Sequence, residues 1–136
     1  MAGRAPCVAV GVLLTIGVVG GCGTVSERQD DVRDTAAAFE RALGEGAYAH
    51  VCAVLAPGTV EELEQSADAP CAKALSEEQL PSGGAVRQTD VYGNQARAVL
   101  ASDVLFLSHF TGGWKVMAAG CRQRPHEPYQ CRIKGG

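Results

Sequence analysis

The sequence lacks a surplus of positive charge. Its 136 residues include 12 basic and 15 acidic side chains, for a net charge of −3. Proteins that bind nucleic acid through phosphate contacts are usually basic, so we expect no nucleic-acid partner. A chain of this length normally forms one domain, because a second core would need roughly 50 residues of its own.

The sequence also lacks the common motifs of catalysis and cofactor binding. It contains no Gly-x-Gly-x-x-Gly, no phosphate loop and no Gly-x-Ser-x-Gly. The three histidines are scattered, and no second histidine follows any of them by three or four residues. No two cysteines stand in a Cys-x-x-Cys pair, as a typical zinc site would have. We therefore expect no metal, no cofactor and no catalytic residue that the sequence alone can name.

No apolar run is long enough to span a bilayer as a helix. The apolar stretch near the start covers the 13 uncharged residues from Cys7 to Val19, whereas a spanning helix needs about 20. Arg4 precedes this stretch and small residues follow it. A positive start, a short apolar stretch and small residues before a cut site are typical of a secretory signal. We therefore predict a signal peptide at residues 1–21.

The residues around the predicted cut site, Val19-Gly20-Gly21-Cys22, resemble the lipobox of bacterial lipoproteins. The family usually has Ala or Ser where this chain has Gly20. The resemblance implies that the Cys22 thiol takes a diacylglycerol and becomes the new N-terminus. Each acyl methylene buried in the bilayer contributes about 0.8 kcal/mol to membrane binding. The acyl chains would therefore hold the protein on the extracytoplasmic face of the cell membrane. The alternative is ordinary cleavage, with Cys22 a free thiol or a disulfide partner.

The chain after Cys22 begins with helical patterns. We predict a lipid-anchored linker at 22–26 and a single domain at 27–136. Ser26 and Gln29 fit a capping box that opens a helix ending near Gly44. One apolar stripe follows this helix at helical spacing, formed by Val32, Ala36, Phe39 and Leu43. Three shorter helices are predicted at 48–55, at 59–66 (opened by a capping box from Thr59 to Glu62) and at 71–75.

A break at Pro81-Ser82-Gly83-Gly84 separates the helices from a run of strands. Residues rich in Val, Leu, Phe and Trp predict four antiparallel strands at 85–92, 95–101, 103–110 and 114–119. The tail from Cys121 to Gly136 contains two prolines, so we expect it to be irregular. The sequence therefore predicts an α+β fold, in which N-terminal helices pack on a curved four-stranded antiparallel sheet.

The strand at 103–110 has two faces with a period of two. One face carries Val104, Phe106, Ser108 and Phe110, and its two aromatic rings make it the expected core face. The other face, which we then expect to meet solvent, carries Asp103, Leu105, Leu107 and His109. Asp103 and His109 would lie about 20 Å apart along the strand, too far to act as one catalytic dyad.

Four cysteines remain for the folded domain once Cys7 is removed and Cys22 is lipidated. They are Cys52, Cys71, Cys121 and Cys131, and they allow three pairings. We favour pairing between sequential cysteines, which are 19 and 10 residues apart. Cys52–Cys71 would pin the second helix to the turn after the third, and Cys121–Cys131 would tie the tail into a loop after the last strand. Oxidising conditions outside the cytoplasm favour disulfides over metal binding. A zinc site is the rival interpretation.

Charge is unevenly distributed along this part of the chain. Residues 22–80 carry a net charge of −8, whereas residues 81–136 carry +4. The simpler interpretation is that exposed helix faces are acidic and the sheet end is basic. The alternative is an electrostatic site for a partner. The basic tail, with Arg122, Arg124, Arg132 and Lys134, is either a solvated loop or a contact for anionic headgroups or wall polymer.

Helices followed by a meander that ends in Gly112-Gly113-Trp114-Lys115-Val116 resemble the nuclear transport factor 2-like superfamily. Phe39, Tyr48 and the strand at 95–101 carry the rest of the likeness, which covers about residues 27–120. The resemblance implies a cone in which helices pack against a strongly curved sheet. The sheet is shorter than in the enzymes of that superfamily, and one early strand pair is absent. With 3 Lys against 9 Arg, the chain also resembles small actinobacterial lipoproteins with two cysteine pairs.

Enzymes of that superfamily use Asp, His and Tyr on the concave face of the sheet. Tyr92, Asp103, His109 and Trp114 are the corresponding pocket candidates here. The first hypothesis is a non-catalytic binding or accessory lipoprotein that contacts an envelope protein or a small ligand. The alternatives are a small-molecule isomerase or dehydratase with a concave pocket, and a structural module whose pocket is filled by its own side chains.

Overall fold

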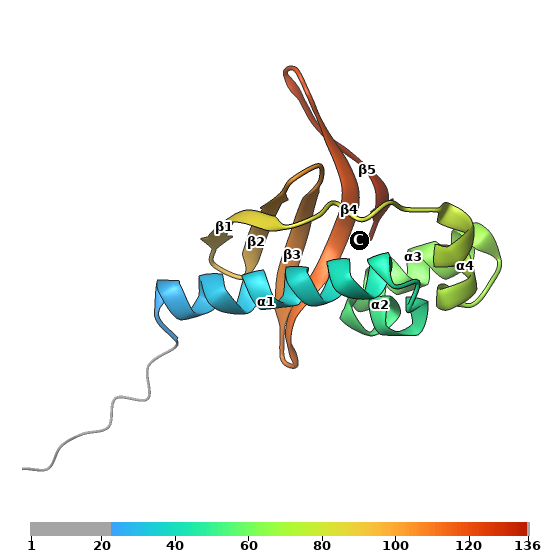
Figure 1. The fold of residues 1–136 in the computed structure, drawn as a ribbon, viewed down its shortest axis with the longest axis horizontal. Coiled ribbons are helices and arrows are strands. Elements are labelled where there is room, and N and C mark those ends of the chain that lie inside the picture. Colours follow the sequence, from blue (N-terminus) through green and yellow to red (C-terminus); the bar gives the residue numbers. More distant parts are fainter. Residues whose placement is uncertain (1–22, 136) are drawn as a thin grey trace, which may run out of the picture.

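The computed structural model describes residues 23–135, so the predicted signal peptide and Cys22 lie outside the described residues. Four helices precede five strands along the chain (Figure 1). The helices are α1 (Val25–Gly44), α2 (Tyr48–Val54), α3 (Pro57–Ala67) and α4 (Cys71–Glu78). The strands are β1 (Val86–Tyr92), β2 (Gln95–Leu100), β3 (Val104–Phe110), β4 (Gly113–Arg124) and β5 (Glu127–Lys134). No helix in the range 23–135 combines the length and apolarity that a membrane crossing requires.

Helix α1 begins with a capping box, but two residues earlier than Ser26 and Gln29 predicted. The Thr24 hydroxyl accepts a hydrogen bond from the Glu27 N–H at 3.2 Å, and the Thr24 N–H donates to the Glu27 carboxylate at 2.6 Å. A Glu carboxylate accepts this bond as an ion, so Thr24-x-x-Glu27 is the stronger of the two overlapping boxes. The predicted apolar stripe of α1 is confirmed, because all four of its residues are buried.

The three short helices are fixed by contacts outside themselves. The Cys52–Cys71 disulfide, as predicted, joins α2 to the start of α4. The capping box predicted at Thr59 is wrong, since α3 begins at Pro57 with Ala56 as its N-cap. The buried Thr59 hydroxyl instead donates to the Met117 carbonyl of β4 at 2.9 Å. This bond ties α3 to the sheet.

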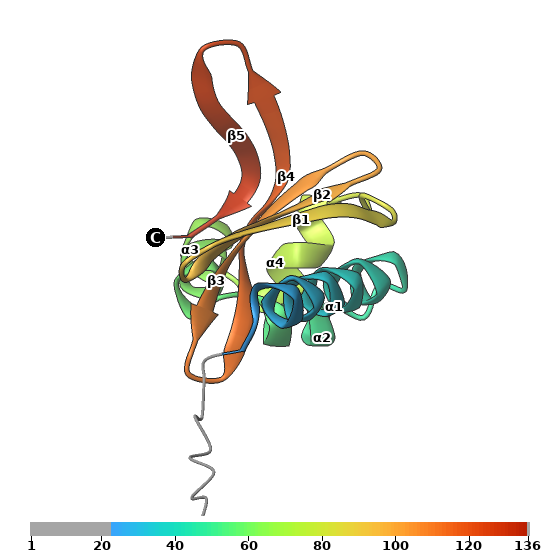
Figure 2. The same cartoon turned by 90° about the vertical axis from the view of Figure 1, so that its left-hand side faces the viewer.

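The sheet has five antiparallel strands in the order β1-β2-β3-β4-β5, one more than predicted. The α+β class is confirmed, but the tail is not irregular. Strand β4 continues to Arg124, and β5 returns beside it with Cys121 opposite Cys131, joined by the second predicted disulfide. The prolines that argued against a strand lie at positions that tolerate them, Pro125 in the turn and Pro128 in an edge strand. The β4–β5 hairpin projects well beyond the other elements (Figures 1 and 2).

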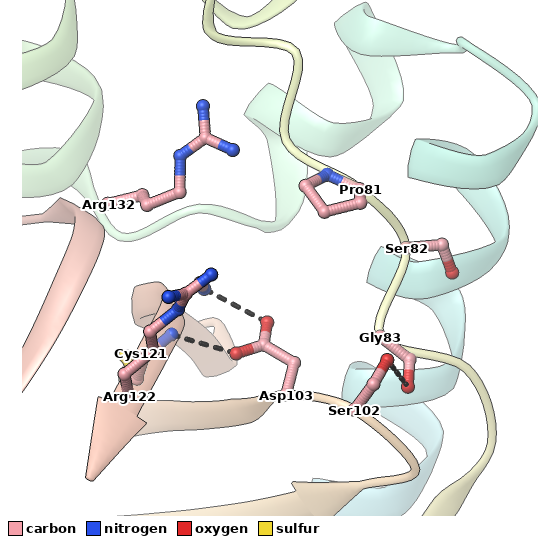
Figure 3. Close-up of a pocket in the computed structure, with 9 residues that line it drawn as sticks. Pro81, Ser82, Gly83, Ser102, Asp103, Cys121, Arg122 and Arg132 are labelled. Atoms are coloured by element: carbon pink, nitrogen blue, oxygen red, sulfur yellow. Dashed lines mark hydrogen bonds between the residues drawn. The ribbon is translucent and has the colours of Figure 1, made fainter.

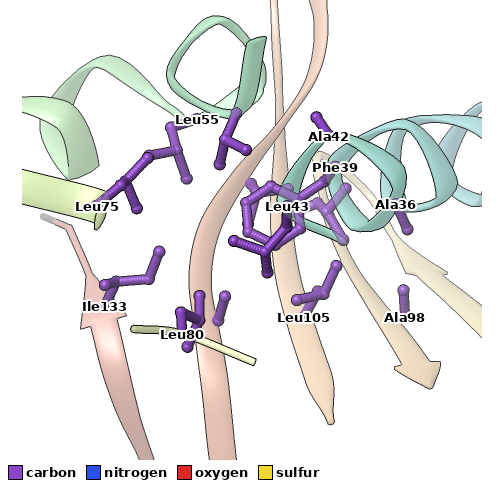
Figure 4. Packing of buried hydrophobic residues seen from close by; sticks show 14 of the residues in the cluster. Ala36, Phe39, Ala42, Leu43, Leu55, Leu75, Leu80, Ala98, Leu105 and Ile133 are labelled. Carbon is purple, nitrogen blue, oxygen red and sulfur yellow. The ribbon is translucent and has the colours of Figure 1, made fainter. Parts of the chain in front are cut away.

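The core face of β3 is the opposite of the predicted one. Leu105 and Leu107 are fully buried, whereas Phe110 is 37% exposed. Phe106 is half-buried and packs edge to face on Tyr129 of β5, with ring centroids 5.1 Å apart. The two leucines lie opposite alanines of β2, and these small residues leave room for α1 (Figure 4). The aromatic rings therefore occupy the face that has no helix over it.

The space between the helices and the sheet is filled by the chain's own side chains. Figure 4 shows residues of α1 directed at residues of the sheet. The large apolar side chains with almost no exposure are Phe39, Leu75, Leu105, Leu107, Val32, Val51 and Val116. Protein interiors packed in this way leave few voids larger than a water molecule.

The assignment of the core face can be tested by a pair of truncations in β3. Leu107→Ala should lower the free energy of unfolding by about 2–5 kcal/mol, because it removes buried methyl groups and leaves a cavity. Phe110→Ala, three residues along the same strand, should change it by less than about 1 kcal/mol. Urea titration followed by circular dichroism measures both. A larger cost for Phe110→Ala than for Leu107→Ala would restore the face predicted from the sequence.

Candidate functional site

The four predicted pocket residues do not form one pocket. Tyr92 ends β1 and is 66% exposed, and Asp103 lies in the turn between β2 and β3. His109 and Trp114 are direct partners across the β3–β4 hairpin, so only these two are brought together. The predicted separation of Asp103 from His109, at opposite ends of β3, agrees with these positions.

His109 and Trp114 line an open groove between α1 and the β3–β4 hairpin. Their ring centroids are 5.1 Å apart at an interplanar angle of 75°, and the Arg28 guanidinium carbon lies 5.4 Å from the centre of the tryptophan ring. The groove has a volume of about 360 Å³, and its other lining residues are Asp31, Asp34, Thr35, Gly112 and Gly113. Trp114 is only 6% exposed, which fits the expected core role beside the hairpin.

This groove does not present an acid–base pair. His109 makes no hydrogen bond or ion pair with Asp31 or Asp34 within the described part of the chain. The Trp114 indole N–H is buried and has no hydrogen-bond partner among residues 23–135. A catalytic imidazole is usually oriented by a second group within hydrogen-bond reach, and the carboxylates of this groove do not provide that contact to His109.

A second hollow, of about 140 Å³, lies beside Asp103 and the segment 81–84, which we call the strap (Figure 3). The Asp103 carboxylate is bound to the main chain. Oδ2 accepts from the Gly120 N–H at 2.9 Å, and Oδ1 accepts from Cys121 at 2.8 Å and Val104 at 2.6 Å. Asp103 therefore fixes β4 next to the β2–β3 turn, a structural role that uses both carboxylate oxygens.

The strap approaches the sheet at a glycine. A Cβ atom added to Gly83 would lie 2.5 Å from the Asp103 Cβ and 2.7 Å from a Leu100 methyl group. Such distances are too short for carbon atoms, so only glycine lets the strap pass this close. Arg122 and Arg132 line the other side of the hollow. The Arg132 guanidinium forms an ion pair with the Glu78 carboxylate at 3.6 Å. Arg122 has no hydrogen-bond or ion-pair partner in the described range.

Glu40 of α1 is a buried carboxylate that binds the strap through hydrogen bonds. Its Oε2 accepts from the Ser82 hydroxyl at 2.8 Å and from the Gly83 N–H at 2.6 Å, while Oε1 has no partner among residues 23–135. Burial raises the pKa of the Glu40 carboxyl, the bonds from Ser82 and Gly83 oppose this rise, and the negative charge of Asp103 adds to it.

Sequence reasoning missed Glu40, although a signal was present. Glu40 follows Ala36 by four residues and precedes Leu43 by three, so its side chain lies at the edge of the apolar stripe of α1. A carboxylate in that position either reaches solvent or finds a buried partner. The sequence does not show that the strap supplies the partner, because 42 residues separate Glu40 from Ser82.

A further charged pair lies on the helix-free face of the sheet. The Arg97 guanidinium binds the Asp90 carboxylate at 2.7 Å across β1 and β2. Hydrogen bonds from Gln88 and from Arg97 lower the pKa of Asp90, and its carboxylate in turn raises the pKa of Arg97. This pair joins two neighbouring strands and lies outside every hollow described above.

Within residues 23–135, no group of three His, Cys, Asp or Glu side chains is arranged to hold a metal ion. Comparison with protein families, with curated proteins and with solved structures found no match to this chain.

The burial of Glu40 predicts a specific pH dependence. Its pKa is higher in the folded than in the unfolded state, so the folded state binds more protons as Glu40 titrates, and its contribution to stability falls as pH rises. The stability of the wild type relative to Glu40→Gln should therefore decrease as the pH rises above the ordinary carboxyl pKa of 4.5. Urea titrations at each pH measure this difference.

The matched control is Glu45→Gln, an exposed carboxylate just beyond the same helix. The Glu40→Gln difference should change more with pH than the Glu45→Gln difference, because only Glu40 is buried. A Glu40→Gln difference that stays constant with pH would show that Glu40 is not held in a desolvated site.

Proposed function

We propose that the chain is a lipid-anchored extracytoplasmic lipoprotein that acts as a non-catalytic binding or accessory module at the cell envelope. The filled interior is the observation that carries the non-catalytic part of this proposal. Fully buried Phe39, Leu105 and Leu107 occupy the space between helix and sheet where a concave enzyme would bind its substrate.

The two disulfides support the proposed location. Disulfides persist in oxidising compartments outside the cytoplasm and are rare inside it. Cys52–Cys71 and Cys121–Cys131 use all four cysteines that the described residues contain. Cys22 is then left without a disulfide partner in the domain, which agrees with the lipobox resemblance around it.

The likeness to the nuclear transport factor 2-like superfamily belongs to the same proposal. Helices that precede an antiparallel meander, with long α1 across one face of the sheet, are consistent with it. The isomerase or dehydratase alternative has less support. Both carboxylate oxygens of Asp103 accept hydrogen bonds from main-chain N–H groups, and His109 has no carboxylate partner in the described region.

The projecting β4–β5 hairpin is the surface that we propose for partner contact. Arg122 lies on its exposed part and lines both the strap hollow and a neighbouring hollow of about 290 Å³. Arg124 is also exposed, but its guanidinium pairs with Glu127 at 3.0 Å. Guanidinium groups bind carboxylates with two parallel hydrogen bonds. A partner that presents carboxylates would therefore suit this hairpin, whether it is an envelope protein or a small ligand.

The proposal is tested by mass spectrometry of the full chain expressed in a bacterium that processes lipoproteins. The mature protein should begin at Cys22 and carry the mass of its acyl chains. Cys22→Ala should abolish this mass and leave the chain uncut at that position. Cys7→Ala is the matched control, because Cys7 lies in the predicted signal and its loss should leave acylation intact. A mature protein with an unmodified Cys22 would contradict the proposal.

A further inference from the structure

We infer that the end of the domain where α1 begins rests on the bilayer surface, with Val25, Tyr92 and Phe110 in contact with lipid. This inference rests on the proposed lipid anchor and adds an orientation to it. The occupant of this apolar end is the membrane to which Cys22 is attached.

The tether that joins the anchor to the domain is very short. Only Gly23 and Thr24 separate Cys22 from the first residue of α1, and Thr24 is already ordered by its capping box with Glu27. Three residue steps span at most about 10 Å, even when the chain is fully extended. A lipid on Cys22 would therefore hold the first turn of α1 within the headgroup layer.

The apolar side chains exposed in the described part of the chain gather at this same end. The large hydrophobic residues with high exposure are Val25 at 69%, Tyr92 at 66% and Phe110 at 37%. Arg28 donates to the Gly93 carbonyl next to Tyr92, and the His109 N–H, next to Phe110, donates to the Asn94 carbonyl at 2.9 Å. The first turns of α1, the β1–β2 turn and the end of β3 therefore adjoin one another.

The chemistry of these side chains fits an interface between water and lipid. Tyrosine is enriched at membrane interfaces, because its ring is apolar and its hydroxyl stays hydrated. Three such side chains would bind a bilayer weakly by themselves, but the anchor makes their contact intramolecular and raises their effective concentration.

The charges of α1 favour an end-on contact over one along its length. Asp30, Asp31 and Asp34 outnumber Arg33 among the exposed charges of its following turns, and a helix lying flat would bring them against anionic headgroups. The one acidic residue of the first turn, Glu27, accepts a hydrogen bond from the Thr24 N–H. The β4–β5 hairpin extends on the side away from the first turn of α1 in both views (Figures 1 and 2). In the inferred orientation, the hairpin with Arg122 and Arg124 points away from the membrane.

The orientation can be measured with tryptophan probes in the lipidated full chain. Tyr92→Trp places a probe at the apolar end, and Arg124→Trp places a matched probe on the exposed hairpin. Each variant is reconstituted in phosphatidylcholine–phosphatidylglycerol vesicles, with and without bromine on the upper acyl chains. Bromine should quench the added emission of Tyr92→Trp about twofold, because the probe reaches the boundary between headgroups and acyl chains. The added emission of Arg124→Trp should not change, and Trp114 is common to both variants.

The outcomes separate this inference from the proposed function. An acyl mass on Cys22 with no quenching of Tyr92→Trp overturns the orientation and leaves the lipoprotein proposal intact. Equal quenching of both probes also overturns it, because the domain would then lie flat. Absence of the acyl mass overturns both. Phe110→Trp serves as a second probe at the same end if Tyr92→Trp fails to fold, and it should be quenched in the same way.

Discussion

The apolar contact between α1 and the sheet is the constraint on which the rest of the domain depends. Val32 and Phe39 of α1 are fully buried, as are Leu105, Leu107 and Val116 of the strands that they cover. Each large side chain buried in this way stabilises the fold by about 1.5–3 kcal/mol. In the described residues, this layer is filled by the chain's own side chains.

The buried or half-buried carboxylates serve the same architecture. Glu40 holds the strap over α1, and Asp103 holds β4 against the β2–β3 turn. Their hydrogen bonds go to the strap and to main-chain N–H groups of the protein itself. The groups left available lie at the two ends, apolar beside the start of α1 and basic on the β4–β5 hairpin.

The sequence allowed the local structure to be predicted better than its long-range arrangement. The stripe of α1, the four helices and both disulfides are confirmed, since helical spacing and cysteine spacing are local signals. The prediction of the core face of β3 was wrong. A period of two defines two faces of the strand, but only packing against α1 determines that the face with Leu107, and not the one with Phe110, is buried. Strand β5 was missed because Pro125 and Pro128 usually indicate irregular structure. Proline is tolerated in a turn or in an edge strand, and the sequence does not show that this segment forms the edge of the sheet. The structure separates the pocket candidates that the sequence prediction had grouped. No local sequence pattern shows which turns of the folded chain lie next to one another. The family resemblance stays a prediction.

The filled interior is the central claim, and xenon under pressure tests it most directly. Apolar cavities large enough for a ligand bind xenon, whereas a packed core does not. A crystal of the protein pressurised with xenon should show no xenon between α1 and the sheet. A well-occupied xenon site beside Phe39 or Leu107 would show that the space between α1 and the sheet is hollow, and it would favour the enzymatic alternative with a concave pocket.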